Sequence, residues 1–161
     1  MRFDPDKYRR RSIRLQGYDY SQPGAYFVTI CTHGQECILG DVIDDSVHMS
    51  PLGEIVGQMW RGLPGRFERV ELDQFVVMPN HVHGIIVITP VVGVGAIHEL
   101  PLRELPRQSK AQRRRMLLPK VIGYFKMNAS KVINELRGTP GGLVWQRNYY
   151  EHIVRGDGRG S

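Results

Sequence analysis

Cysteine is scarce in this chain of 161 residues, which has only Cys31 and Cys37 and no Cys-x-x-Cys pair. Two thiols do not make a disulfide framework, so we expect buried or partly buried thiols in a reducing compartment. Long hydrophobic runs are also missing, and residues 1–4 do not begin a signal peptide. These absences predict a cytoplasmic protein with no membrane partner.

Acidic residues are outnumbered, with 16 Asp and Glu against 22 Lys and Arg and a net charge of +6. Such a surplus suggests a polyanionic partner, either nucleic acid or an acidic membrane surface, although many basic proteins bind neither. The content of 41% hydrophobic and 24% charged residues is typical of a globular domain. We therefore expect one domain over residues 1–161.

Residue patterns predict the order strand, strand, helix, strand, strand, helix, strand. The strands are expected over residues 25–32, 36–40, 70–77, 81–89 and 144–155. A first helix is expected to start at Ser50-Pro51 and to end at Pro64-Gly65, and a second to run from Pro119 to Gly138. Outside these elements we expect a basic N-terminal arm, a Pro- and Gly-rich and then basic insertion, and a flexible tail, over residues 1–24, 90–117 and 156–161.

This order predicts an α+β fold in which an antiparallel sheet carries both helices on one face. Such a sheet can leave its other face open to a ligand. His81 and His83 start the fourth expected strand, directly after the Met78-Pro79-Asn80 turn, and alternation puts both rings on one face. The pair could hold a divalent cation, or the two rings could be ordinary hydrogen-bonding partners.

Several other residues are candidates for contact with nucleic acid, each with a structural alternative. Tryptophan followed two residues later by arginine could stack on a base and grip a phosphate, or the indole could pack against the second helix. Adjacent cations outside any apolar stripe suit phosphate contact, or they are simply solvated. These candidates are Arg9, Arg10, Arg11, Lys110, Arg113, Arg114, Arg115, Lys126, Trp145 and Arg147.

Four blocks of the sequence, taken in order, resemble the REP-associated tyrosine transposases of the HUH superfamily of single-strand DNA nucleases. They cover residues 9–20, 26–32, 76–83 and 145–155. The resemblance implies a ferredoxin-like fold and metal-dependent cleavage and joining of single-stranded DNA at hairpins during transposition. It also implies that His81 and His83 bind Mg²⁺ or Mn²⁺. His152, on the last expected strand, could support a ligand imidazole, or it could simply fix the end of its strand with a hydrogen bond.

The chain departs from the family in one respect. The family's nucleophilic tyrosine lies on a helix after the Trp-Gln…Glu-His block, and no such segment is expected before Ser161. Tyr149 and Tyr150 are weak substitutes, with strand packing as their alternative role. The sequence thus predicts either a DNA-cleaving transposase or a module that binds hairpin DNA without cutting it, and it leaves monomer and homodimer open. A ferredoxin-like RNA binder ranks last, because the aromatic strand motif of such proteins is missing.

Overall fold

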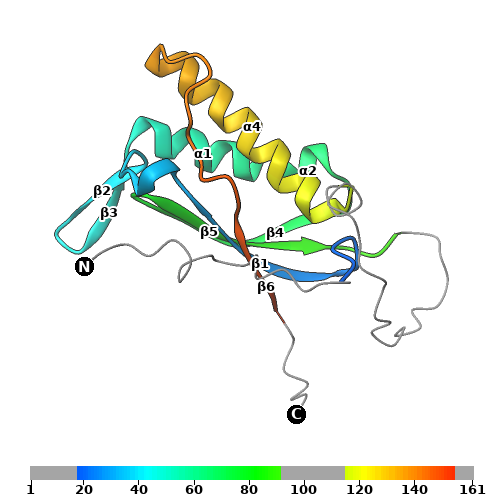
Figure 1. The fold of residues 1–161 in the computed structure, drawn as a ribbon. Helices are drawn as coiled ribbons and strands as arrows, with labels where there is room; N and C mark the ends of the chain where they lie inside the picture. The colour runs from blue at the N-terminus through cyan, green and yellow to red at the C-terminus, as the bar shows by residue number, and fades with distance from the viewer. Residues whose placement is uncertain (1–17, 92–114, 155–161) are drawn as a thin grey trace, which may run out of the picture.

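The computed structural model describes residues 18–91 and 115–154. Its main sheet has four antiparallel strands in the order β4-β5-β1-β6. The helices α1, α2 and α4 all lie on one face of this sheet (Figure 1). The bounds of these elements are Gly24–Cys31 for β1, Pro51–Arg61 for α1, Leu63–Arg66 for α2, Val70–Met78 for β4, His81–Ile88 for β5, Leu117–Arg137 for α4 and Tyr150–Val154 for β6.

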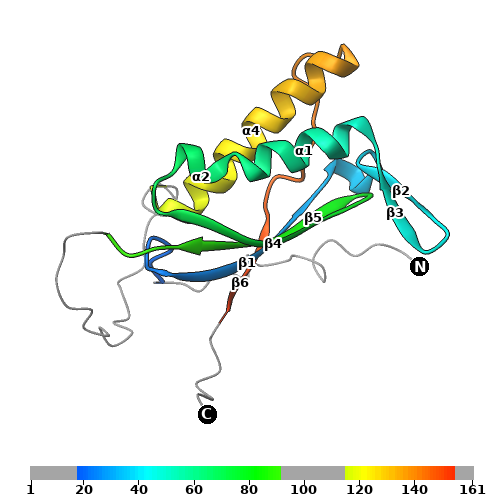
Figure 2. The same ribbon diagram turned by 180° about the vertical axis from the view of Figure 1, so that it is seen from behind.

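The path β1-α1-β4-β5-α4-β6 is that of the ferredoxin-like fold, so the predicted α+β class is confirmed. Every second residue of β5, and of β1 from Tyr26 to Ile30, is buried beneath the helices, as the strand period requires. The helices add large side chains to this core, of which Trp60 and Phe125 meet edge to face with ring centroids 5.3 Å apart. Among the described residues, no helix covers the opposite face of the sheet (Figure 2).

Gly84 sets how closely α1 approaches the sheet. A Cβ atom at this position would lie 2.4 Å from Cζ2 of Trp60, closer than real side chains tolerate. The Trp60 ring also stacks on Phe75 of β4, with centroids 4.7 Å apart. The missing side chain therefore gives the indole its place directly over β5.

The first helix begins as predicted, because the Ser50 hydroxyl accepts a hydrogen bond from the Gly53 amide at 3.2 Å. Its predicted end is wrong by a few residues. The helix stops at Gly62, and Pro64 and Gly65 belong to the short helix α2 that follows. The second predicted helix ends as expected, since Gly138 caps α4 in the left-handed conformation at φ 63°.

The predicted second strand, residues 36–40, is wrong. Residues His33–Gln35 form a 3-10 turn, η1, and the chain then makes a separate hairpin from β2 (Gly40–Ile43) and β3 (Ser46–Met49). This hairpin projects from the body of the molecule (Figure 2). Its turn is formed by Asp44 and Asp45, whose φ angles are 49° and 60°.

The last strand is shorter than the predicted range of residues 144–155. Residues 144–149 form an irregular segment, and the strand β6 begins only after it, at Tyr150. Cys37 is exposed rather than buried, while Cys31 is half-buried as expected. None of the described helices combines the length and the apolar character that crossing a bilayer demands. The expected arm up to residue 17, the insertion over residues 92–114 and the whole tail, residues 156–161, lie outside the described residues.

Candidate metal and nucleic-acid site

The start of β5 carries the histidine pair. Pro79 and Asn80 join β4 to β5, so His81 is the first residue of the strand. Val82 between the two histidines is fully buried under the helices. His81 and His83 are half-buried and project from the opposite, helix-free face, as the sequence predicts.

The two imidazoles converge. Nε2 of His81 lies 2.8 Å from Nε2 of His83, and the ring planes are inclined by 78°. Each Nδ1 atom is held from behind by an oxygen: Asn80 Oδ1 is 2.7 Å from His81 Nδ1, and Thr29 Oγ1 is 2.9 Å from His83 Nδ1. Thr29 reaches His83 because the two residues are direct partners in the β1–β5 register.

With both rings neutral, these contacts are satisfied by one arrangement of protons. An amide oxygen can only accept, so the Nδ1 atom of His81 carries the proton and its Nε2 atom carries a lone pair. The short contact between the rings then requires His83 to donate its Nε2 proton and Thr29 to donate to His83 Nδ1. If the Thr29 hydroxyl rotates and accepts instead, the His83 proton moves to Nδ1 and both Nε2 lone pairs face the same point.

The surroundings of His83 favour the neutral form of its ring. Burial lowers the pKa of His83 below its ordinary value, and the neighbouring His81 lowers it further. The ring of Phe27 stacks on His83 with centroids 5.5 Å apart, and it supplies part of that burial. A neutral imidazole is the form that can coordinate a metal ion.

The pair fits two adjacent positions in the shell of a divalent cation. Two such ligands at about 2.1 Å from a metal lie about 3 Å apart, close to the observed separation of the Nε2 atoms. The described part of the chain provides no group of three His, Cys, Asp or Glu side chains for a metal. Water and phosphate oxygens would have to complete the shell, and the imidazoles favour Mn²⁺ over the harder Mg²⁺.

The candidate tyrosines face opposite ways. Tyr150 is the direct partner of Thr29 in the β1–β6 register, so it shares the open face with the histidine pair. Tyr149 turns toward α4, and its hydroxyl is buried. His152 is exposed on the open face opposite Phe27, which separates it from His83.

The predicted DNA-binding residues have different surroundings. Trp145 is only 7% exposed, and its ring centroid lies 5.7 Å from that of Phe125 in α4, so the indole packs against the second predicted helix, as the packing alternative states. Arg147 and Arg115 are exposed, and the Nζ atom of Lys126 donates to the Gln146 carbonyl at 2.6 Å. The remaining candidates, Arg9, Arg10, Arg11, Lys110, Arg113 and Arg114, lie outside the described residues.

Three residues of the site were missed by the sequence reasoning. Asn80 and Thr29 orient the imidazoles, and Phe27 covers one of them. Asn80 directly precedes the pair, which is a usable signal. Thr29 and Phe27 lie more than 50 residues earlier, and only the strand register brings them to the site.

Comparison with known sequences finds a clear relative. It is an uncharacterized protein of Haemophilus influenzae strain Rd, 39% identical over 150 residues that cover 92% of this chain and 80% of the relative. The chain belongs to the same family as this protein. No described family model matches the sequence.

Solved structures with a similar course of the chain include two transposase structures. One is a REP-associated tyrosine transposase bound to a REP hairpin, at 16% identity and a TM-score of 0.47, and it covers 92% of this chain. This chain spans 62% of that protein's length. The other is a candidate transposase of Deinococcus radiodurans R1, at 17% identity and a TM-score of 0.49, with 88% and 87% of the two chains covered. At this level of similarity neither structure identifies a function.

Proposed function

We propose that the chain is an HUH-type enzyme that cleaves and rejoins single-stranded DNA with the help of Mn²⁺ or Mg²⁺. The observation that carries the proposal is the convergence of the His81 and His83 Nε2 atoms at 2.8 Å on the open face of the sheet. The four sequence blocks that resemble the REP-associated tyrosine transposases support it. The expected partner is single-stranded or hairpin DNA. The protein would act on it as a monomer or as a homodimer.

In this proposal the two histidines coordinate the cation, and the pairing of β5 with β1 positions the histidines. A bound divalent cation would offset the negative charge that develops on a non-bridging phosphate oxygen during cleavage. Asn80 and Thr29 keep both Nε2 atoms directed at the same point, so little reorganisation is needed when the cation and the DNA bind. The open face leaves room for the sugar-phosphate backbone beside them.

The test is incubation of the protein with Mn²⁺ and a labelled hairpin oligonucleotide that carries a single-stranded flank. Replacement of either ligand, His81→Ala or His83→Ala, should lower the rate of nicking by about a hundredfold or more, because the charge compensation is lost. His48→Ala is the matched control, since this histidine is exposed on β3, outside the main sheet. Nicking that persists in both ligand variants would overturn the proposal.

A covalent protein–DNA adduct reports the nucleophile. Of the two candidate tyrosines, Tyr150 shares the face of the histidine pair, so Tyr150→Phe tests it most directly. Loss of the adduct together with unchanged Mn²⁺ binding would assign the attack to Tyr150. An adduct of normal yield would assign it to a residue elsewhere in the protein.

A second function, DNA binding without cleavage, is favoured by one observation. Within the residues that the structure describes, no third His, Cys, Asp or Glu side chain joins the pair. A module of this kind would retain salt-sensitive binding to the hairpin but would nick it neither with Mn²⁺ nor with Mg²⁺. The same assay therefore separates the two functions.

A further inference from the structure

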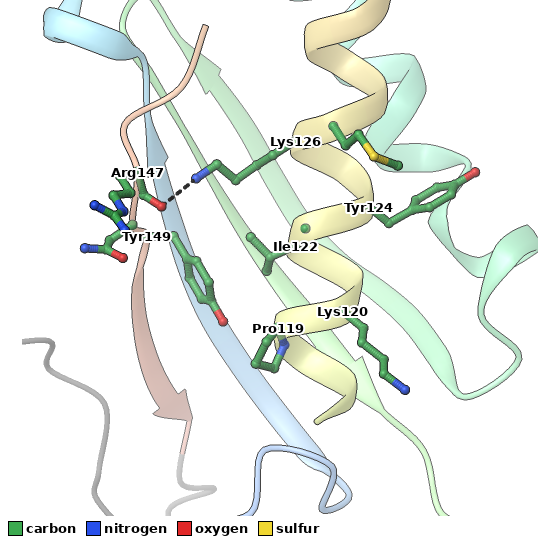
Figure 3. A pocket seen from close by; sticks show the side chains of 10 residues that line it. Pro119, Lys120, Ile122, Tyr124, Lys126, Arg147 and Tyr149 are labelled. Atoms are coloured by element: carbon green, nitrogen blue, oxygen red, sulfur yellow. Dashed lines mark hydrogen bonds between the residues drawn. The ribbon is translucent and has the colours of Figure 1, made fainter. Parts of the chain in front are cut away.

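A hollow of about 560 Å³ lies over α4, on the side of the sheet away from the histidine pair. Figure 3 shows its two sides: α4 carries Lys120, Ile122 and Lys126, and the segment before β6 carries Arg147 and Tyr149. Lys120 and Arg147 lie on opposite rims, with Ile122 and the Tyr149 ring between them. The complete lining is Pro119, Lys120, Ile122, Gly123, Tyr124, Lys126, Met127, Arg147, Asn148 and Tyr149.

The lining is positively charged. Three of its ten residues are Lys or Arg and none is Asp or Glu. Lys126 ties the two sides together, because its Nζ atom lies 2.6 Å from the Gln146 carbonyl oxygen and 3.4 Å from that of Arg147. The guanidinium of Arg66 lies 5.6 Å from the centroid of the Tyr124 ring and adds a further cation next to the hollow. This charge favours an anionic ligand.

Gly123 lines the hollow from the interior of α4. Glycine in the interior of a helix costs about 1 kcal/mol relative to alanine, so it needs a packing or functional reason. Packing gives none, because a Cβ atom at Gly123 would meet nothing within 4 Å. A longer side chain would instead project into the hollow that this residue lines. Glycine here allows a ligand to approach the helix backbone.

We propose that this hollow binds a nucleotide unit of single-stranded DNA. Lys120 and Arg147 would contact phosphates on the two rims, and the sugar or base would lie over Gly123 against the Tyr149 ring. A single strand fits better than a duplex, because the apolar and aromatic groups of the lining need an unpaired base or exposed sugar to contact. The inference rests on the proposed function and adds a second contact of the same substrate, remote from the histidine pair.

The experiment measures binding of a fluorescent oligo(dT) of about 12 nucleotides by anisotropy, in EDTA and low salt, so that no cation site takes part. Gly123→Ala and Gly123→Gln form a size series in which affinity should fall stepwise, by about tenfold for glutamine, while thermal unfolding shows that the helix is intact. Lys120→Glu should also weaken binding about tenfold and reduce the salt dependence. Lys131→Glu is the matched control, because this exposed lysine lies about 16 Å further along α4 and does not line the hollow.

Equal affinity across the Gly123 series, or an equal loss from Lys120→Glu and Lys131→Glu, would overturn the inference. Tighter binding of oligo(U) than of oligo(dT) would assign the hollow to RNA and overturn it as well. Nicking measured on the same samples separates the two proposals. If affinity falls along the Gly123 series but the wild type never nicks the DNA, the binding hollow is supported and the proposed enzymatic function is wrong. If nicking depends on the histidines but affinity does not change with the residue at position 123, the enzymatic function is supported and the binding hollow is wrong.

Discussion

Thr29 holds the Nδ1 atom of His83 at 2.9 Å, and it thereby decides which nitrogen of that ring faces the partner imidazole. Thr29→Val keeps the shape of the side chain and removes the hydrogen bond. We expect the affinity for Mn²⁺ to fall by about tenfold, because groups behind a metal ligand typically contribute tenfold to a hundredfold. Isothermal titration with MnCl₂ measures the effect.

The matched control for Thr29 is Thr89→Val. The Thr89 hydroxyl also makes a hydrogen bond, which it donates to the Arg69 carbonyl oxygen at 3.3 Å, but Thr89 lies just beyond the far end of β5. Its replacement should leave Mn²⁺ binding unchanged. Equal affinities for wild type and Thr29→Val would show that the threonine does not orient the ring.

Tyr26 makes the stability of the fold sensitive to alkaline pH. Burial, and then the hydrogen bond with Tyr18 at 3.2 Å, raise the pKa of Tyr26 well above its ordinary value near 10. Above pH 10 the unfolded chain loses this proton while the folded chain keeps it, so the free energy of unfolding should fall as pH rises, by up to about 1.4 kcal/mol per pH unit. Below pH 10 this contribution is constant.

Urea unfolding of wild type and Tyr26→Phe, at intervals of roughly half a pH unit between pH 8 and pH 11, measures how the free energy of unfolding of each protein depends on pH. The phenylalanine variant loses the hydrogen bond to the Gln22 carbonyl at 2.8 Å and should be less stable at pH 8. Its stability should nevertheless fall less steeply above pH 10. Parallel curves for the two proteins would contradict the assignment.

At the scale of elements, the contact of α1 with β5 depends on a missing side chain. Gly84→Ala places a Cβ atom 2.4 Å from Trp60 Cζ2, so the indole must move and the stack on Phe75 must loosen. We expect the variant to lose about 1–3 kcal/mol of unfolding free energy. Chemical denaturation gives this value directly.

The same substitution at Gly123 should act in the opposite direction. Its Cβ atom would meet nothing within 4 Å, so Gly123→Ala should gain up to about 1 kcal/mol from helix propensity. The pair of variants shares one chemical change and differs only in surroundings. If both destabilise the protein alike, helix packing over β5 is not what Gly84 provides.

How well elements could be predicted depended on whether they bury a face. β1 and β5 alternate between core and surface, and α1 and α4 carry apolar stripes. The hydrophobic pattern of the sequence was therefore enough to predict these four elements. The hairpin of β2 and β3 was missed because seven of its eight strand residues are exposed and its Asp44-Asp45 turn lacks glycine. Periodicity reports burial, and this hairpin has almost none.

At the scale of the whole molecule, the site could be predicted only in part. His81 and His83 are neighbours in sequence, so strand alternation alone placed them on one face. Which residues support the rings depended on the pairing between β1 and β5, because Thr29 lies 54 residues from His83. The sequence likewise left open whether Trp145 is packed in the core or exposed, and only the contact with Phe125 decides this.

The edge of the sheet at β6 links the two proposed contacts with DNA. The hollow is bordered by Arg147 and Tyr149, directly before this strand, while Tyr150 lies on the opposite, open face. Since β6 is the edge strand of the sheet as far as the described residues go, a single strand of DNA that touched both the hollow and the histidine pair would pass around this edge. DNA on this path would have phosphates on both sides of β6.

The most direct test of the cation site is a titration of the protein with Mn²⁺ followed by electron paramagnetic resonance, in which the signal of free Mn²⁺ disappears on binding. The wild type and His48→Ala should each bind a single equivalent of Mn²⁺, more tightly than Mg²⁺, and His81→Ala and His83→Ala should bind none at the same concentrations. Identical titration curves for all four proteins would contradict the claim that the converging imidazoles form a metal site.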